Sequence, residues 1–200
     1  APETVTTLDG GIKWAGGRFA GEAIGYYSWY RDKITSVLTG EVTPSGRLVV
    51  QNRNATSLEV YGAELGARYA FGDALEAHGS LTWTVGNETY AGDEYPADRI
   101  TPVNGSAGVL WRLRDDLSLD AFATFAGLQD RYSPRDEVDP RIRPGGTPGW
   151  TTWNARLAWE ATGHVRLALQ LQNLSDRRYR EYGSGLDAYG FNAAATLELG

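Results

Sequence analysis

Two histidines, His78 and His164, are the first residues to consider for catalysis or metal binding. Ser80 and Thr82 follow His78 at every second position, so on an extended strand the imidazole and both hydroxyls share one face. A hydrolase needs an imidazole beside an activated hydroxyl or a paired carboxylate, and a metal site needs several converging ligands. His164 stands apart beside a short turn, and the chain has no cysteine. The sequence therefore predicts no catalytic residue, no metal site and no cofactor.

Arginine and tyrosine side chains gather in two polar segments, where they could bind an anion. Planar guanidinium groups and aromatic faces suit an anionic, ring-bearing ligand. The candidate ligand-binding residues are Tyr90 and Tyr95 in segment 87–101, and Arg131, Tyr132, Arg141 and Arg143 in segment 129–148. The second segment also contains Asp130, Asp136, Glu137 and Asp139, so salt bridges between loops would use the same arginines. Both interpretations stay open.

Composition excludes several classes of protein. The 19 basic and 25 acidic residues give a net charge of −6, which provides no basic surface for nucleic acid. No stretch approaches the roughly 18 apolar residues that a membrane-spanning helix needs. Glycine (25), tryptophan (7) and tyrosine (11) are abundant, which favours an all-β chain. Because methionine is absent, we expect an internal or C-terminal piece of a longer protein.

The elements that must position these residues are strands, because period-two alternation dominates the chain. Apolar and polar residues alternate from 75 to 85 and again in 61–71, 103–113, 117–127, 152–160, 165–172 and 191–199. The apolar faces are long compared with soluble strands, which average about 5–6 residues in total. About nine antiparallel strands are expected, near 4–14, 19–38, 47–71, 74–86, 102–113, 117–129, 149–160, 164–174 and 189–199. The second and third are expected to form a long hairpin around Pro44-Ser45-Gly46.

The connections and the aromatic residues indicate a membrane barrel. Segments 15–18, 72–73, 114–116 and 161–163 are short, whereas those near 32–47, 87–101, 130–148 and 175–188 are long and polar, as in outer-membrane barrels. Apolar-face aromatics lie near the short turns (Trp14, Tyr69, Phe71, Trp111, Trp159) and near the long loops (Trp83, Phe125, Trp153). Two such belts are typical of rings at the two membrane–water boundaries. The sequence predicts an antiparallel transmembrane β-barrel segment over residues 1–200, and the odd strand count indicates part of a larger barrel.

Three segments resemble the TonB-dependent outer-membrane receptors. QLQNLSDRRY (170–179) is similar to the ending of the family's penultimate strand, with matches at Asn173, Leu174, Asp176, Arg178 and Tyr179. PETVTTLDGGIKW (2–14) and SLEVYGAELGARYAF (57–71) are similar to two earlier strands, in the family's order. The resemblance implies the C-terminal part of a barrel of about 22 strands, without the N-terminal plug domain. The family usually ends in an aromatic residue, so we expect one residue to be missing after Gly200.

The resemblance also implies a function. It implies residence in the outer membrane, contact with lipid, and contact with the TonB complex through the missing N-terminal part. The implied activity is import of a scarce nutrient rather than catalysis. A ferric siderophore is the first expectation for that nutrient, and cobalamin or an oligosaccharide is the alternative. The candidate ligand-binding residues named above are then the expected ligand surface, because binding residues are often located on loops that a rigid scaffold holds in place.

Two alternatives belong to other classes. A passive porin or adhesin barrel would have no plug, and an outer-membrane enzyme would need a catalytic group that the sequence does not offer. The polar-face charges Glu64, Arg68, Arg112, Asp120, Arg156, Glu160, Arg166 and Glu198 include both signs. They are expected to pair across strands for the most part, although contact with a plug or a ligand path would also use them.

Overall fold

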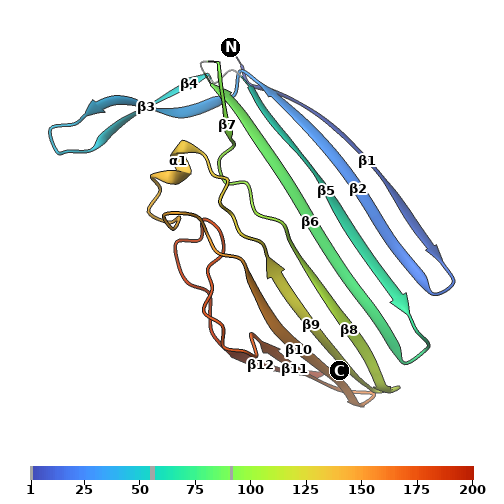
Figure 1. The fold of residues 1–200 in the computed structure, drawn as a ribbon. Coiled ribbons are helices and arrows are strands. Elements are labelled where there is room, and N and C mark those ends of the chain that lie inside the picture. Colours follow the sequence, from blue (N-terminus) through green and yellow to red (C-terminus); the bar gives the residue numbers. More distant parts are fainter. Residues whose placement is uncertain (1, 55–56, 91) are drawn as a thin grey trace.

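The computed structural model of the chain describes residues 2–54, 57–90 and 92–200. It shows one broad, curved antiparallel sheet, with a small ribbon of two strands that projects from one end (Figure 1). The elements are β1 (Thr4–Gly16), β2 (Phe19–Arg31), β3 (Ile34–Val42), β4 (Leu48–Asn54), β5 (Ser57–Ala70), β6 (Leu75–Tyr90), β7 (Asp93–Pro96), β8 (Asn104–Arg114), β9 (Leu117–Ala126), α1 (Pro134–Glu137), β10 (Trp150–Thr162), β11 (Val165–Gln172) and β12 (Asn192–Leu199).

The strands of the large sheet form an antiparallel meander. Within the described ranges nine of them lie in the order β1-β2-β5-β6-β8-β9-β10-β11-β12, and β7 pairs with β6 alone. Neighbouring strands are antiparallel, and the register between β1 and β2 is continuous from Thr4↔Arg31 to Gly16↔Phe19. The register shifts between Arg112 and Arg114 in the β8–β9 pair and between Glu160 and Thr162 in the β10–β11 pair. The predicted all-β, antiparallel barrel segment of about nine strands is therefore confirmed.

Two long strands expected from the sequence are interrupted. The expected strand 19–38 breaks at Asp32, where the left-handed backbone (φ 53°) turns the chain out of the sheet. Asn54 donates its side-chain amide to the Asp32 carbonyl at 2.7 Å, which closes the base of the ribbon. The expected hairpin turn around 44–46 is present, with Thr43 N donating to Arg47 O at 2.7 Å, but its strands β3 and β4 form a sheet of their own.

The segment 87–101, expected to be a loop, is largely extended. β6 runs on to Tyr90, and β7 folds back on it from Asn87↔Pro96 to Tyr90↔Asp93. Tyr90 and Tyr95 therefore lie on strands rather than on a loop, because pairing with β6 satisfies the backbone of this polar segment.

The register places the apolar positions of neighbouring strands side by side. Leu65 pairs with Leu81 across β5 and β6, and Trp159 pairs with Leu167, which pairs with Leu197. Among the described residues only three apolar side chains are buried: Leu58, Ala97 and Ile142. The surface of 12975 Å² also exceeds the roughly 9,300 Å² of a compact monomer of this mass. The apolar side chains thus form an outer face and not a core.

Aromatic rings mark both ends of this apolar face. At the short-turn end, Trp14 stacks on Phe19 with centroids 5.0 Å apart, and Trp159 donates Nε1–H to Asp116 Oδ2 in the β8–β9 turn at 3.0 Å. At the other end, Tyr61 packs against Tyr27 at 5.4 Å and against Trp83 at 5.9 Å. The predicted Trp83 thus belongs to a larger ring cluster, as expected where amphipathic rings meet a membrane boundary.

The opposite face is polar and paired across strands. Hydroxyls of Ser80 and Ser106 lie 2.9 Å apart, and Arg166 contacts Glu160 at 2.6 Å and Glu198 at 3.6 Å. The expected cross-strand pairing is therefore confirmed for Arg166. Within the described residues no helix is long and apolar enough to cross a membrane.

The two faces can be distinguished with one substitution at two exposed alanines. Ala121 of β9 lies on the apolar face and Ala168 of β11 on the polar face. In the full-length protein, Ala121→Arg should destabilise the bilayer-embedded state by about 2–4 kcal/mol, whereas Ala168→Arg should have little effect. Denaturant unfolding in lipid vesicles measures the difference, and equal losses at both positions would mean that the faces are misassigned.

Candidate functional site

Three loops lie together at the end of the sheet opposite the short turns (Figure 1). We call them the β7–β8 loop (97–103), the β9–β10 loop (127–149) and the β11–β12 loop (173–191). The β9–β10 loop contains α1, whose N-cap Ser133 accepts a hydrogen bond from Asp136 N at 3.0 Å. This cap fixes Asp136 in the middle of the three loops.

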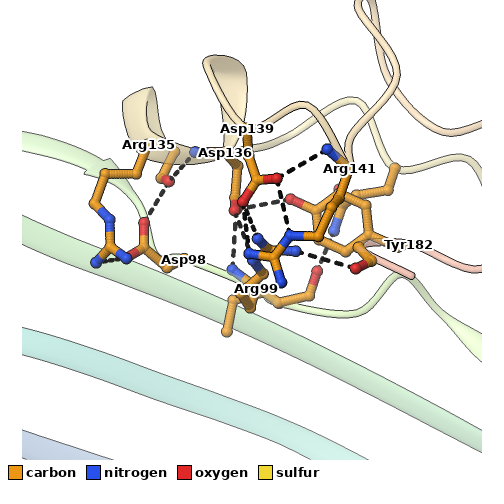
Figure 2. Close-up of polar contacts among 11 residues, drawn as sticks. Asp98, Arg99, Arg135, Asp136, Asp139, Arg141 and Tyr182 are labelled. Carbon is orange, nitrogen blue, oxygen red and sulfur yellow. Dashed lines mark hydrogen bonds and ion pairs between the residues drawn. The ribbon is translucent and has the colours of Figure 1, made fainter. Parts of the chain in front are cut away.

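Asp136 is the buried centre of these contacts (Figure 2). Its side chain is 3% exposed, and burying a carboxylate is costly unless it is paired and hydrogen-bonded. Arg99 of the β7–β8 loop supplies its backbone N–H at 2.9 Å and its Nε at 3.2 Å. Tyr182 of the β11–β12 loop donates its hydroxyl at 2.8 Å. One carboxylate therefore joins all three loops.

Further ion pairs surround this centre. Arg99 also contacts Asp139, which receives Nε and Nη2 of Arg141 at 3.0 and 2.8 Å. Arg135 pairs with Asp98 at 2.5 Å, and the Ser133 hydroxyl donates to Asp98 as well. We call this set the rim network, and it consists of Asp98, Arg99, Ser133, Arg135, Asp136, Asp139, Arg141 and Tyr182.

Protonation states follow from these contacts. Hydrogen bonds from Arg141, together with the nearby Arg99, lower the pKa of Asp139 from 3.8 to about 2. Burial, and then the hydrogen bond to Asp136, raise the pKa of Tyr182, so its phenol keeps the proton that it donates. A carboxyl group whose pKa is lowered by folding stabilises the folded state at any pH above its ordinary pKa. That stabilisation is lost as the pH falls toward the pKa of the folded state. The Asp139 contacts should therefore persist from neutral pH down to about pH 4 and weaken between pH 4 and 2.

Close approach of two loops requires a glycine at one point. Gly183 has a φ of +73°, and a Cβ on it would lie 2.5 Å from Nη1 of Arg99. Nη1 donates to the Gly183 carbonyl at 3.3 Å. Only glycine fits both the left-handed backbone and this contact.

The six predicted ligand-binding residues are distributed around the network rather than gathered. Arg141 is held by Asp139, so the salt-bridge interpretation applies to this residue. Arg131 donates to the side chain of Asn87, and Tyr132 is half-buried. Tyr90 is half-buried at the end of β6, and the hydroxyl of exposed Tyr95 reaches Asp93 at 3.5 Å. Arg143 is exposed and lies at a hollow shared with the β11–β12 loop.

The motif residues of segment 173–179 organise the β11–β12 loop. Asn173 is 3% exposed with a positive φ of 50°. Its side chain donates to the carbonyls of Arg177 at 2.9 Å and Tyr189 at 3.1 Å, and it accepts Arg177 N at 3.0 Å. Its backbone N–H donates to Asn154 Oδ1 on the polar face at 3.0 Å. Asn173 thus ties both ends of the loop to the sheet.

The other motif residues extend this attachment. Leu174 N donates to Trp153 O at 2.8 Å, and Asp176 accepts Phe191 N at 2.9 Å, just before β12 begins. Tyr179 packs on Trp150 with ring centroids 4.3 Å apart. The motif therefore positions the loop against the polar face of the sheet.

A hollow of about 540 Å³ separates this loop from the polar face. Phe122, Arg156, Tyr179 and Tyr189 line it, and the Arg156 guanidinium lies 4.8 Å above the Phe122 ring. The sequence prediction did not include this hollow. Phe122 and Arg156 share the polar face of the sheet, but Tyr179 and Tyr189 come from a distant segment of the chain, and spacing does not reveal that they meet.

The histidines do not assemble a catalytic site. His78 Nε2 contacts Asp120 Oδ1 at 2.8 Å across two strands, whereas the Ser80 hydroxyl is engaged with Ser106. The imidazole–carboxylate pair orients the ring but has no activated nucleophile beside it. Among the residues that the structure describes, no group of three or more histidine, aspartate or glutamate side chains could hold a metal ion.

Comparisons with known proteins agree with this geometry. A family described as "TonB dependent receptor-like, beta-barrel" matches residues 1–174. The chain is similar in fold to the copper transporter OprC (20% identity, TM-score 0.84), covering 99% of this chain and 31% of that one. It is also similar to the FrpB iron transporter from Neisseria meningitidis (15%, 0.73; 98% and 30% covered). A third similar structure is the ferric enterobactin receptor PfeA from Pseudomonas aeruginosa (17%, 0.71; 98% and 31% covered). The chain thus spans about a third of the length of these structures, and no curated protein matches it in sequence.

Neutralising Asp136 should loosen all three loops at once. Asp136→Asn removes the charge that Arg99 and Tyr182 contact, and a hydrogen bond to a charged group contributes about 1.5–3 kcal/mol. Hydrogen exchange in the full-length protein should therefore become roughly ten- to a hundredfold faster in all three loops and stay unchanged in the strands. Asp130→Asn, an exposed position of the same loop, is the matched control. Faster exchange in the β9–β10 loop alone would contradict a shared centre.

Asn173 should matter for the assembly of the last hairpin. Asn173→Ala removes four side-chain hydrogen bonds at a left-handed position, for an expected loss of about 2–4 kcal/mol. Thermal unfolding of the full-length protein in detergent measures this loss. Asn192→Ala, at an exposed position where β12 begins, should leave the thermal unfolding transition unchanged. If both substitutions lower the stability equally, Asn173 has no special role in this hairpin.

Proposed function

The chain belongs to the TonB-dependent receptor family, of whose β-barrel it forms a part, and we propose that the full-length protein imports a ferric siderophore. The family consists of transporters and receptors and not of enzymes. Its members reside in the outer membrane, and the apolar outer face of this chain lies there against lipid. Energy would reach the receptor from the TonB complex through the N-terminal part that lies outside this chain.

The observation that carries the proposal is the hollow between the β11–β12 loop and the polar face. Its volume of about 540 Å³ falls in the range of small-molecule sites, about 300–1,000 Å³. Its lining includes the guanidinium of Arg156 and the rings of Phe122, Tyr179 and Tyr189. Two carboxylates, Glu181 and Asp187, line it as well, and Asp187 is paired with Arg180 at 2.8 Å. The guanidinium and the rings suit the anionic and ring-bearing parts of a ligand.

The residue types favour a chelate over a bare metal ion. The chain has no cysteine and no methionine, which are the soft ligands that copper(I) prefers. In a siderophore the iron is already coordinated, so the receptor recognises charge and shape instead of supplying ligands. Charged and aromatic groups fit that task, and the described residues include no cluster of metal ligands.

The loop candidates take two roles in this proposal. Tyr90, Tyr95, Arg131, Tyr132 and Arg143 face the ligand as it approaches, since they lie outside the ion pairs of the rim network. Arg141 acts indirectly by holding Asp139 and with it the β7–β8 loop.

The test is uptake by cells that express the full-length protein and lack other chelate receptors. We expect saturable uptake of one class of ferric siderophore among catecholates, hydroxamates and carboxylates, and loss of that uptake in cells without TonB. Uptake of copper or cobalamin with none of any iron chelate would assign another ligand. Uptake that continues without TonB would contradict energised transport.

Two substitutions test the ligand surface. Arg156→Gln and Arg131→Gln should each raise the KM of uptake about tenfold, because each removes a charge-assisted hydrogen bond. Surface folding should not change. Arg112→Gln is the matched control, since this polar-face arginine contacts the Asp73 carbonyl at the short-turn end. A KM that stays at the wild-type value in both variants would move the ligand to another surface.

A further inference from the structure

Four arginines surround a second hollow, of about 280 Å³, at the start of β10. Arg143 comes from the β9–β10 loop, and Arg177, Arg178 and Arg180 come from the β11–β12 loop. Asp187 is the only acidic residue among those that line it. The chain as a whole carries a net charge of −6, so this concentration of positive charge is local. Like charges held close together repel one another unless an anion lies between them.

Two of these arginines are engaged and two are not. Arg177 donates to the Gly149 carbonyl at 3.2 Å, and Arg180 donates to Asp187 at 2.8 Å. Arg143 and Arg178 are exposed at the hollow, and within the described ranges no hydrogen bond or ion pair engages either guanidinium. Two planar cations are thus available to one ligand.

The backbone that carries these two arginines is fixed in advance. Gln129 and Thr147 exchange backbone hydrogen bonds at 3.0 and 2.9 Å, which closes the β9–β10 loop behind Arg143. Gly146 permits this closure, because its φ is +103° and a Cβ on it would lie 2.7 Å from Gln129 O. On the other side, Asn173 binds both the N–H and the carbonyl of Arg177, next to Arg178. Little ordering is then needed when a ligand binds.

The second hollow adjoins the first. Tyr179 and Asp187 line both, and Tyr179 packs on Trp150, which lines the arginine hollow. A solute held by the arginines would therefore lie next to the aromatic hollow on the polar face, and not against the apolar outer face.

We propose that Arg143 and Arg178 form a binding site for an oxyanion, a carboxylate or phosphate group, carried by the solute that the receptor imports. This inference rests on the proposed function and adds that the imported solute carries a negative charge. Guanidinium groups bind such oxyanions through paired N–H donors. The arginine hollow receives the anionic group first, and the aromatic hollow behind it receives the ring-bearing part.

Direct binding tests the site without transport. The full-length receptor, purified in detergent, is titrated calorimetrically with inorganic pyrophosphate. Arg143→Gln and Arg178→Gln should each weaken binding about tenfold, and the double variant more strongly. Arg47→Gln, an exposed arginine in the β3–β4 turn, is the matched control and should bind as the wild type does. Unchanged affinity in the double variant, or an equal loss in the control, overturns the site.

A second measurement separates an imported solute from a lipid phosphate. The lipopolysaccharide that copurifies with the receptor should be the same for the wild type and the double variant. A smaller amount of copurified lipopolysaccharide in the double variant would assign the site to lipid phosphate and overturn its role in import.

Uptake separates this inference from the proposed function. If the receptor imports an iron chelate and the double variant raises its KM at least tenfold with unchanged surface folding, the site serves import. If uptake by the double variant equals that of the wild type, the site is overturned while the proposed function stands. If no iron chelate is imported although pyrophosphate binding depends on both arginines, the proposed function fails and the oxyanion site remains.

Discussion

The hydrogen-bonded ladder between neighbouring strands is the constraint on which the rest of the structure depends. In hydrocarbon each unsatisfied backbone N–H or carbonyl costs several kcal/mol, so a spanning chain must satisfy them internally. The antiparallel pairing from β1↔β2 to β11↔β12 does so, with register shifts in the β8–β9 and β10–β11 pairs. Stability here comes from that ladder and from lipid contact, since buried apolar side chains are few in the described part of the chain.

The ladder also determines what each side chain meets. Because successive side chains point to opposite faces, a single register sets one face against lipid and the other against the polar interior. Pairs such as Leu65↔Leu81 on one face and Glu64↔Thr82 on the other follow from the same alignment. Rings then lie where the ladder ends, as with Trp159 and its hydrogen bond to Asp116.

Beyond the ladder, the loops need another source of order. They bury the apolar side chains of Ala97 and Ile142, and polar contacts supply further order: the buried Asp136 joins three loops, and the buried Asn173 fixes both ends of the last one. Such order is local, so the loops can open while the strands stay paired. The loops therefore combine a defined resting arrangement with freedom to move.

The sequence by itself determined the fold class, the order of the sheet strands, the two faces and the aromatic belts. These follow from alternation within single segments, which is a local property of the residues. It also located the motif at Asn173 and the arginines of the β9–β10 loop. It did not determine where β2 leaves the sheet, because the turn depends on the left-handed backbone of one residue, Asp32.

Only the tertiary structure decided which charges are engaged and which are open. Arg141 and Arg143 are two positions apart and are the same residue type, yet one is bound by Asp139 and the other lies at the hollow with Arg178. Arg141 is paired inside its own loop, by Asp139 two positions before it. Arg143 lies beside Arg178 because the β9–β10 and β11–β12 loops meet in space, and spacing in the sequence does not reveal that meeting.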